Sequence, residues 1–385
     1  MKEIYLDNAA TTPVLPQVVE AIIDCLKNDY GNPSSMHRLG IQAEKRVREA
    51  KGRLSSLLRC TEDEIIFTSG GTEANNMAVL GTAYDKKRRG RHCITTEIEH
   101  PSVLQAFAHL EEQGYEVSYL PVDQNGVISL DHLKSLIRPD TILVSIMHVN
   151  NETGSIQPIR QIGAMLKAGP GKPVFHVDAI QSLGKLPVYP AQWGIDLLSA
   201  SGHKIHAPKG IGALYIRRGV RIQPILFGGN QQGGIRSGTE NIPGIVGMGE
   251  GAKWMAERLA EEGGCLAQLK SRLLQGILQA FPDAVINGSA DACASHIINV
   301  GFPGLRGEIL LHALEEEGVY VSTGSACSSR DKRFSHVLEA MGLNDRILEG
   351  SIRLSTSYLT TMQDIEEFLP RLTRTVQRIE RFTRR

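Results

Sequence analysis

Seven short apolar runs, separated by longer stretches with helical spacing of apolar residues, occupy the chain from about residue 64 to residue 217. The runs are EIIFTS, HCITTE, EVSYLPV, TILVSIMHV, PVFHVD, IDLLSAS and GALYIRR. Strands that alternate with helices in this way are typical of a mainly parallel sheet with helices on its faces. The pattern therefore predicts an α/β fold with a mainly parallel seven-stranded sheet.

The pattern changes near residue 245. It is mostly helical to about residue 280, with GGC at 263–265 as a break, and then restarts as HIINVGF, GEILLHALEEEG, VYVSTGS and GSIRLSTS. These alternations predict a smaller α+β unit, whose last helical stretch contains Pro370 and should kink or break there. Because 385 residues exceed one typical core, we predict a large domain over 13–257 and a small C-terminal domain over 258–385, with residues 1–12 packing on the small domain.

Charge and cysteine content narrow the class of protein. The chain has 42 Lys and Arg residues and 42 Asp and Glu residues, so no net field attracts nucleic acid or a membrane. Its six cysteines are scattered without a CxxC pair, which is typical neither of a disulfide framework nor of a zinc finger. The N-terminal segment lacks the apolar core of a signal peptide, and no run of about 18 apolar residues occurs. We therefore expect an enzyme of the reducing cytoplasm.

Two basic runs could contact tRNA or an acidic partner, namely KKRRGR at 86–91 and the arginine-rich last fifteen residues. More often such runs are solvated helix ends whose positive charge complements the helix dipole. We adopt that interpretation and expect no direct binding of nucleic acid and no binding to membranes.

Polar residues follow five of the seven strands of the predicted sheet, where loops and helix N-termini converge on bound ligands. In chain order they are Gly71 and Thr72, His100, Asn150 and Asn151, Asp178 and Gln181, and finally Ser201, His203 and Lys204. Each has an ordinary interpretation: a strand-to-helix turn, a helix cap, a loop residue or a solvated lysine. Their coincidence at one sheet edge favours a ligand site.

A glycine turn before a helix can hold a phosphate, and an aspartate and a lysine nearby match the needs of pyridoxal 5'-phosphate. The amine forms an imine with the cofactor aldehyde, and the carboxylate keeps the pyridine nitrogen protonated. Lys204 and Asp178 would fill these roles. A zinc site made of His100, His203 and His206 is the rival interpretation, but the HxxH spacing is loose and no acidic or thiolate ligand adjoins it. We expect no metal.

Nine segments in register resemble the cysteine desulfurases of the nitrogen-fixation and iron–sulfur assembly type. They are YLDNAATTP, YGNPSSMHRLG, FTSGGTEANN, EHPSVL, MHVNNETGSIQP, HVDAIQSLGK, SGHKIHAPKGIGALYIR, GGNQQGGIRSGTEN and STGSACSS. The resemblance covers essentially the whole chain. It implies a homodimeric fold-type I enzyme that uses pyridoxal 5'-phosphate to remove sulfur from L-cysteine, leaving L-alanine.

The resemblance also implies residue roles. Lys204 would be the Schiff-base lysine, His100 would stack on the ring and transfer protons, and Asp178 would pair with the ring nitrogen. Gln181 would bind the phenolic oxygen. Asn151 and Arg353 would bind the substrate carboxylate, for which the planar fork of an arginine is suited. The phosphate ligands would be Gly71, Thr72, Ser201 and His203, with Thr239 reaching the phosphate from the partner subunit.

Cys327 would accept the sulfur as a persulfide and pass it to an iron–sulfur scaffold or a tRNA-thiolation enzyme. A lone cysteine after a strand is often a packing residue, but STGSACSSRDKRFSH over 322–336 is small, polar and charged, which is typical of an exposed loop. Members of one subgroup have a proline where this chain has Phe334, which leaves the acceptor open. Two alternatives remain: a cystine or selenocysteine lyase, or a related enzyme, that uses Lys204 and Asp178 without a persulfide, and a non-catalytic scaffold.

Overall fold

The computed structural model describes residues 2–169, 171–261, 264–289, 292–323 and 334–383. Cys327 and its neighbours Arg330, Lys332 and Arg333 lie outside the described residues.

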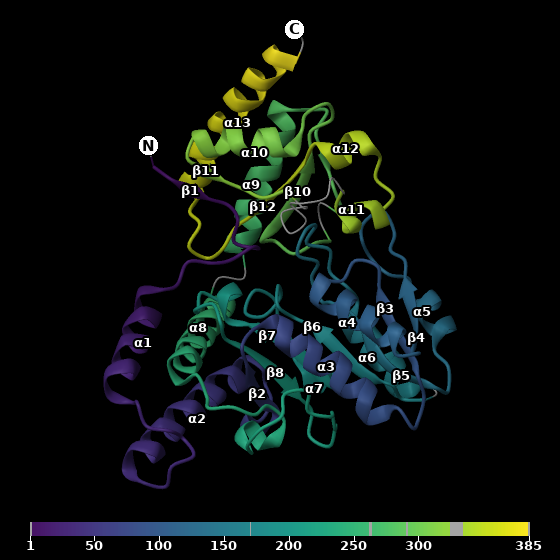
Figure 1. The fold of residues 1–385 in the computed structure, drawn as a ribbon. Helices are drawn as coiled ribbons and strands as arrows, with labels where there is room; N and C mark the ends of the chain where they lie inside the picture. Colours follow the sequence, from purple (N-terminus) through teal and green to yellow (C-terminus); the bar gives the residue numbers. More distant parts are fainter. Residues whose placement is uncertain (1, 170, 262–263, 290–291, 324–333, 384–385) are drawn as a thin grey trace.

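A seven-stranded sheet forms the centre of the larger part of the molecule, in the order β2, β8, β7, β6, β5, β3, β4 (Figure 1). β8 is antiparallel to both of its neighbours, and every other neighbouring pair is parallel. The bounds are β2 Ile65–Thr68, β3 His92–Thr96, β4 Glu116–Leu120, β5 Thr141–Ser145, β6 Val174–Asp178, β7 Leu197–Ser201 and β8 Gly212–Ile216. The predicted α/β fold and the seven predicted strands are confirmed.

The strands read as continuous apolar runs because both faces of the sheet are buried. In β7, Leu197 packs into one core cluster and Leu198 into another, on the opposite face. On the first side lie α3 and α4, which supply Met77 and Phe107 to the core. The other cluster contains residues of α2, α6 and α8, such as Leu54. Burial on both faces fixes the register of the central strands and therefore the position of the polar residues at their ends.

Most helices of this larger part cover the two faces of the sheet, whereas α1 packs on α8 (Figure 1). Their bounds are α1 Pro16–Asn28, α2 Arg38–Leu58, α3 Gly71–Lys86, α4 Pro101–Glu112, α5 Leu130–Leu136, α6 Ile159–Ala168, α7 Pro190–Trp193 and α8 Ile242–Glu261. Three short 3₁₀ turns are η1 Glu62–Glu64, η2 Gly202–Lys204 and η3 Gln231–Gly234.

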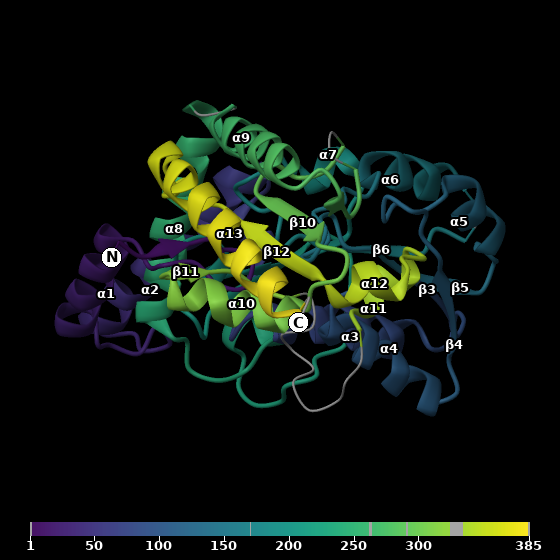
Figure 2. The same cartoon turned by 90° about the horizontal axis from the view of Figure 1, so that it is seen from above.

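A smaller part contains the antiparallel sheet β12-β10-β9 and a parallel pair of β1 with β11. Its strands are β1 Ile4–Tyr5, β9 Val285–Ile286, β10 Ile297–Gly301, β11 Val319–Tyr320 and β12 Ser351–Ser355. Its helices are α9 Cys265–Ala280, α10 Gly307–Glu316, α11 His336–Ala340, α12 Asp345–Glu349 and α13 Met362–Thr383. Viewed from above, α9, α10 and α13 gather around β10 and β12 (Figure 2).

The N-terminal segment joins this smaller part, since Ile4 and Leu6 are fully buried in its core cluster. The predicted division at 257–258 falls within the last turns of α8, whose buried residues belong to the core of the large sheet. A division between α8 and α9 is equally compatible with the two core clusters, and the exact boundary stays a prediction.

The C-terminal arginines bind acidic residues of the neighbouring α10 segment. Arg378 pairs with Glu316 at 2.9 Å and Arg374 with Glu317 at 3.4 Å. Such exposed pairs add little stability, and the interpretation of the basic run as a solvated helix end stays a prediction. Within the described ranges, no helix is both long enough and apolar enough to span a bilayer.

Candidate active site

The predicted site residues meet at the carboxyl ends of the central strands. Asp178 is the last residue of β6, and Ser201 is the last residue of β7. η2 follows β7 directly and contains His203 and Lys204. The N-terminus of α3 lies against this segment, because Gly71 closely approaches Ser201. The fold thus brings together residues that lie up to 133 positions apart, as the strand-end argument predicts.

A hollow of about 360 Å³ opens where α3 begins. Its lining includes four of the predicted phosphate ligands, Gly71, Thr72, Ser201 and His203. Gly70 precedes the helix and no described side chain caps it, so the first amide groups of α3 are available to an anion. Lys209 also lines this hollow and adds positive charge. The donors and the space suit a phosphate group.

Gly71 is required by packing as well as by its place at the helix start. A Cβ atom at this position would collide with Cδ1 of Ile180. Ile180 follows Asp178 by two residues, and its backbone amide donates to Asp178 Oδ1 at 3.0 Å. The glycine therefore allows the phosphate hollow and the aspartate to lie next to each other.

Asp178 is a buried carboxylate with two hydrogen-bond donors. Besides Ile180 N–H, Asn75 Nδ2 of α3 donates to Asp178 Oδ2 at 2.8 Å. Burial raises the pKa of Asp178, whereas both donors and the nearby His100 and Lys204 act in the opposite direction. A protonated pyridine nitrogen placed against the Asp178 carboxylate would offset the free-energy cost of burying that negative charge.

Lys204 lies with its amine against the N-terminal segment. Its Nζ donates to the carbonyl of Ala10 at 2.6 Å and also to that of Ala9. Gln181 Nε2 donates to the same Ala9 carbonyl at 2.9 Å, and the buried Oε1 of Gln181 has no partner in the described part of the chain. Lys204 and Gln181 thus both donate to the Ala9 carbonyl, and Oε1 of Gln181 can still accept a hydrogen bond.

A second lysine, Lys185, contacts the backbone of Lys204. Lys185 is buried, and its Nζ donates to the main-chain carbonyl of Lys204 at 3.0 Å. Burial, followed by repulsion from Lys204, lowers the pKa of Lys185 to about 7. This contact supports the backbone of Lys204 from the protein interior.

The three histidines of the rival zinc interpretation are each engaged elsewhere. His203 Nδ1 faces Thr11 Oγ1 at 3.2 Å and His206 Nδ1 faces the Pro13 carbonyl at 2.9 Å. His100 Nδ1 accepts from Ser102 N–H at 3.1 Å. Among the residues that the structure describes, no group of three or more His, Cys, Asp or Glu side chains is arranged to hold a metal ion.

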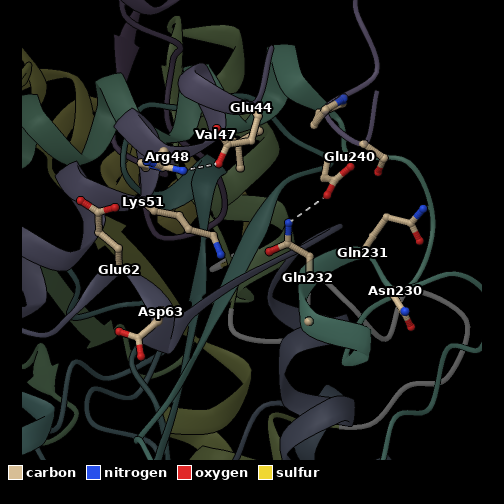
Figure 3. Close-up of a pocket in the computed structure, with 13 residues that line it drawn as sticks. Glu44, Val47, Arg48, Lys51, Glu62, Asp63, Asn230, Gln231, Gln232 and Glu240 are labelled. Carbon is tan, nitrogen blue, oxygen red and sulfur yellow. Dashed lines mark hydrogen bonds and ion pairs between the residues drawn. The ribbon is translucent and has the colours of Figure 1, made fainter. Parts of the chain in front are cut away.

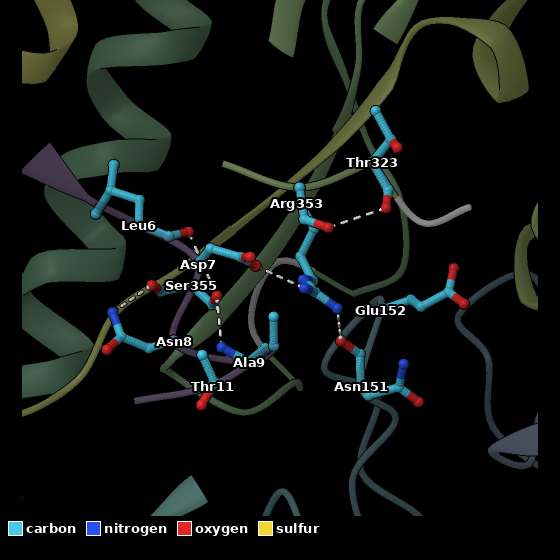
Figure 4. A network of polar contacts seen from close by, with 12 residues as sticks. Leu6, Asp7, Asn8, Ala9, Thr11, Asn151, Glu152, Thr323, Arg353 and Ser355 are labelled. Carbon is cyan, nitrogen blue, oxygen red and sulfur yellow. Dashed lines mark hydrogen bonds and ion pairs between the residues drawn. The ribbon is translucent and has the colours of Figure 1, made fainter. Parts of the chain in front are cut away.

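The predicted substrate residues Arg353 and Asn151 also meet (Figure 4). Arg353 lies on β12, and its Nη1 donates to the Asn151 carbonyl at 3.0 Å. Nη2 binds Asp7 Oδ1 at 2.7 Å, while the buried Nε has no partner within the described ranges. The guanidinium is therefore held from two sides, and its Nε–H is available for a further acceptor, such as a substrate carboxylate.

Both ends of the segment that contains Cys327 are attached beside these residues. Ser322 and Arg353 exchange two backbone hydrogen bonds, at 2.6 and 3.1 Å. At the other end, Ser335 Oγ donates to the buried Glu152 Oε2 at 2.5 Å. Glu152 follows Asn151 directly in the chain, so both attachments are close to the predicted carboxylate site.

Comparison with known proteins identifies the family. The family model of the class-V aminotransferases matches residues 4–368 of this chain. The chain belongs to the class-V aminotransferases. Enzymes of this family use pyridoxal 5'-phosphate.

Among curated relatives of this class-V aminotransferase, "Cysteine desulfurase 2" of Trichormus variabilis is 46% identical over 379 residues, which cover 98% of this chain and 94% of the relative. "Cysteine desulfurase IscS" of Methanosarcina thermophila is 44% identical over 378 residues, covering 98% and 93%. A solved NifS-like protein superposes with a TM-score of 0.92 at 38% identity, covering 98% of this chain and 100% of its own.

Thr239, one of the residues predicted to bind the phosphate, lies away from the hollow at the start of α3. Thr239 is exposed and is not part of the lining of the hollow at α3. It neighbours a different hollow of about 440 Å³ between α2 and the 230–240 segment, which Glu240, Gln232 and Lys51 help to line (Figure 3). The structure of one subunit therefore does not bring Thr239 to the predicted phosphate position.

Sequence reasoning missed several residues of the site. Asn75 and Ser102 were inside motifs already noted, and helical spacing puts Asn75 one turn after Gly71, on the same face of α3. Asp7 stands in YLDNAATTP, where nothing local signals a partner at position 353. The Ala9 and Ala10 carbonyls have no signature at all, because every residue has a carbonyl group.

Proposed function

We propose that the chain is a cysteine desulfurase that holds pyridoxal 5'-phosphate on Lys204, converts L-cysteine to L-alanine and transfers the sulfur to Cys327. The main support is one arrangement: the Lys204 amine, the Asp178 carboxylate and the uncapped start of α3 at a single sheet edge. When bound, the cofactor supplies an aldehyde that links to amines and a ring that withdraws electrons from the substrate.

The residues of the chain fit this cofactor. The hollow at Gly71, Thr72, Ser201 and His203 suits its phosphate. Asp178 suits the ring nitrogen, because a buried carboxylate is stabilised by an adjacent cation. The unpaired Oε1 of Gln181 suits a hydroxyl donor, while its Nε2 stays bound to the Ala9 carbonyl. We assign the cofactor to these residues.

L-cysteine would be held by its carboxylate at Arg353, whose Nε is the unpaired buried donor, with Asn151 next to it. Asp7 and the Asn151 carbonyl fix the guanidinium plane before substrate arrives, which reduces the entropy cost of binding. Lys204 or His100 would take the proton from the substrate carbon. Both lie near Asp178, and the Lys204 amine binds the same Ala9 carbonyl as Gln181.

Cys327 would take the sulfur atom. The net step forms a sulfur–sulfur bond on Cys327 and replaces the carbon–sulfur bond of cysteine with a carbon–hydrogen bond in alanine. Cys327 is four residues from Thr323, so chain length alone keeps it within roughly 14 Å of that residue. Three other cysteines are poor nucleophiles, because burial raises the pKa of Cys25 to about 11 and those of Cys60 and Cys93 to about 12.

We further propose a homodimer of the cytoplasm in which Thr239 completes the partner's phosphate site. Its exposure, away from the hollow in its own chain, supports this arrangement. The persulfide would go to an acceptor protein, either an iron–sulfur scaffold or a tRNA-thiolation enzyme.

The test is alanine formation from L-cysteine by the purified protein loaded with cofactor. We expect alanine and sulfide in equal amounts when a reducing thiol is present. Pyruvate and ammonia as products, or activity on cystine alone, would instead indicate a lyase.

A further inference from the structure

Lys185 links the two strand-end segments that form the candidate active site. It ends the short segment after β6 that begins with Asp178 and contains Gln181. Its Nζ donates to the main-chain carbonyl of Lys204 at 3.0 Å. Lys204 belongs to η2, which follows β7, the parallel neighbour of β6 in the sheet. One side chain therefore joins the segment that would bind the pyridine ring to the segment that would bind the cofactor aldehyde.

The backbone before Lys185 is packed closely against α8. Gly184 has a φ of +74°, which favours glycine, and a Cβ atom there would collide with the side chain of Met255 on α8. The Lys185 amide donates to the Ser182 carbonyl at 3.0 Å, which closes the turn. The side chain of Lys185 thus enters the protein interior, and only 6% of the residue is exposed.

A buried amine without an acidic partner costs folding free energy. Among the residues that the structure describes, the Lys204 carbonyl is the hydrogen-bond acceptor of Lys185, and no carboxylate forms an ion pair with it. Burial, followed by repulsion from Lys204, lowers the pKa of Lys185 to about 7, in agreement with this environment. A side chain such as Met would avoid the cost of burying an amine. The bond to Lys204 is therefore the feature that requires a lysine here.

The other titratable groups that interact with Lys185 are also basic. They are His203, His206 and His296. Burial lowers the pKa values of His203 and His206 to about 4 and also lowers that of His296, so these rings are uncharged near neutral pH. In the described part of the chain, no acidic group therefore competes with the Lys204 carbonyl for the Lys185 amine.

We propose that Lys185 is a positioning residue: its hydrogen bond to the Lys204 carbonyl fixes η2 relative to the end of β6 and so holds the Lys204 amine in reach of the cofactor. The alternative is a purely structural lysine, which would affect stability alone. The role toward the cofactor rests on the proposed function, whereas the hold on η2 does not.

Lys270 provides a matched control. It is similarly buried, with 7% of the residue exposed, and its Nζ also donates to a main-chain carbonyl, that of Cys293, at 3.4 Å. Lys270 lies on α9, in the smaller part of the molecule. Lys185→Met and Lys270→Met therefore each remove one buried amine that binds a carbonyl, and the first of these amines binds η2.

Hydrogen exchange in protein without cofactor is the direct test. The amides of Ile205 and Ala207 donate to the Gly202 carbonyl at 2.9 and 3.1 Å, so their exchange reports on this turn. We expect exchange of the 202–207 peptide to be roughly two- to tenfold faster in Lys185→Met, as for the loss of one hydrogen bond, and unchanged in Lys270→Met. Lys185→Leu should give the same increase and replaces Lys185→Met if that variant does not fold. Wild-type exchange in the Lys185 variants, or an equal increase in the control, would overturn the proposal.

Cofactor attachment is the second test. The rate of attachment and the circular dichroism of the bound cofactor both depend on where the Lys204 amine is held. We expect Lys185→Met to attach the cofactor roughly two- to tenfold more slowly, with altered circular dichroism and the same final amount bound, and Lys270→Met to match wild type. Equal behaviour of the two variants would contradict the role of Lys185. If wild-type protein forms no alanine, the proposed function fails, and hydrogen exchange still decides whether Lys185 holds η2.

Discussion

Arg353 and Asp7 form an ion pair across 346 residues of sequence, with Nη2 2.7 Å from Oδ1 and the arginine side chain only 7% exposed. The pair ties β12 to the N-terminal segment that also binds Lys204. It positions the guanidinium without using its Nε donor. The predicted carboxylate site is therefore built before the substrate arrives.

Replacing this guanidinium should affect substrate binding. A lysine keeps the charge but loses the planar fork, so we expect Arg353→Lys to raise KM for L-cysteine by about 10- to 100-fold, a loss of roughly 1.4–2.7 kcal/mol. The absorption of the bound cofactor should persist. Steady-state kinetics measure the effect, with Arg371→Lys as control, since Arg371 is equally buried but binds main-chain carbonyls of Lys2 and Glu317. An equal rise of KM in the control would contradict the assignment of Arg353.

The glycine at the start of α3 allows a double-variant test. Gly71→Ala places a methyl group against Cδ1 of Ile180, and we expect a loss of about 1–3 kcal/mol in stability together with weaker cofactor binding. Ile180→Val removes that carbon, so the double variant should regain most of the affinity. Cofactor titration followed by absorption measures both. Weaker binding without rescue would mean that the collision is not the cause.

Glu99 gives a prediction about pH. Burial raises its pKa from 4.5 to about 8, so between these values the folded protein keeps a proton that the unfolded chain has released. The contribution of Glu99 to stability is therefore complete below about pH 4.5 and falls as the pH rises to about 8. Glu99→Gln, which is neutral throughout, should gain stability relative to wild type by a few kcal/mol over this range. Urea unfolding at both ends of the range measures the difference, and a constant difference would refute the shift.

The sequence predicted the framework well, for a physical reason. Strands buried on both faces, such as β7 with Leu197 and Leu198 on opposite sides, appear as short apolar runs, which their length and their alternation with helical stretches distinguish from helices. The strand-end rule then placed Asp178, Ser201 and Lys204 at one edge. Their catalytic roles remain predictions.

Contacts between distant segments could not be predicted in the same way. The pairing of β1 with β11 and the bond from Lys204 to the Ala10 carbonyl depend on tertiary packing, and neither leaves a local pattern. Pro370 gave a misleading signal for a break, because α13 runs without interruption from Met362 to Thr383. Packing of the helix on the core outweighs the local cost of the proline.

Two neighbouring lysines make the cofactor attachment testable. Lys185 is buried and its pKa is lowered to about 7, so its amine is a chemical rival of Lys204. We expect borohydride reduction to fix the cofactor on the peptide that contains Lys204 and not on that of Lys185. Lys185→Met should keep this labelling, and Lys204→Ala should abolish it. Label on the Lys185 peptide of wild-type protein would reverse the assignment.

The central claim is sulfur transfer from L-cysteine to Cys327, and mass spectrometry tests it most directly. The protein, loaded with cofactor, is treated with L-cysteine without reducing thiol, and the peptide that contains Cys327 is analysed. We predict one additional sulfur atom on that peptide and one alanine formed per sulfur bound. Cys327→Ala should keep the absorption of the cofactor and release no sulfide under thiol. An unmodified Cys327 peptide in protein that turns over cysteine, or full turnover by Cys327→Ala, would contradict the account.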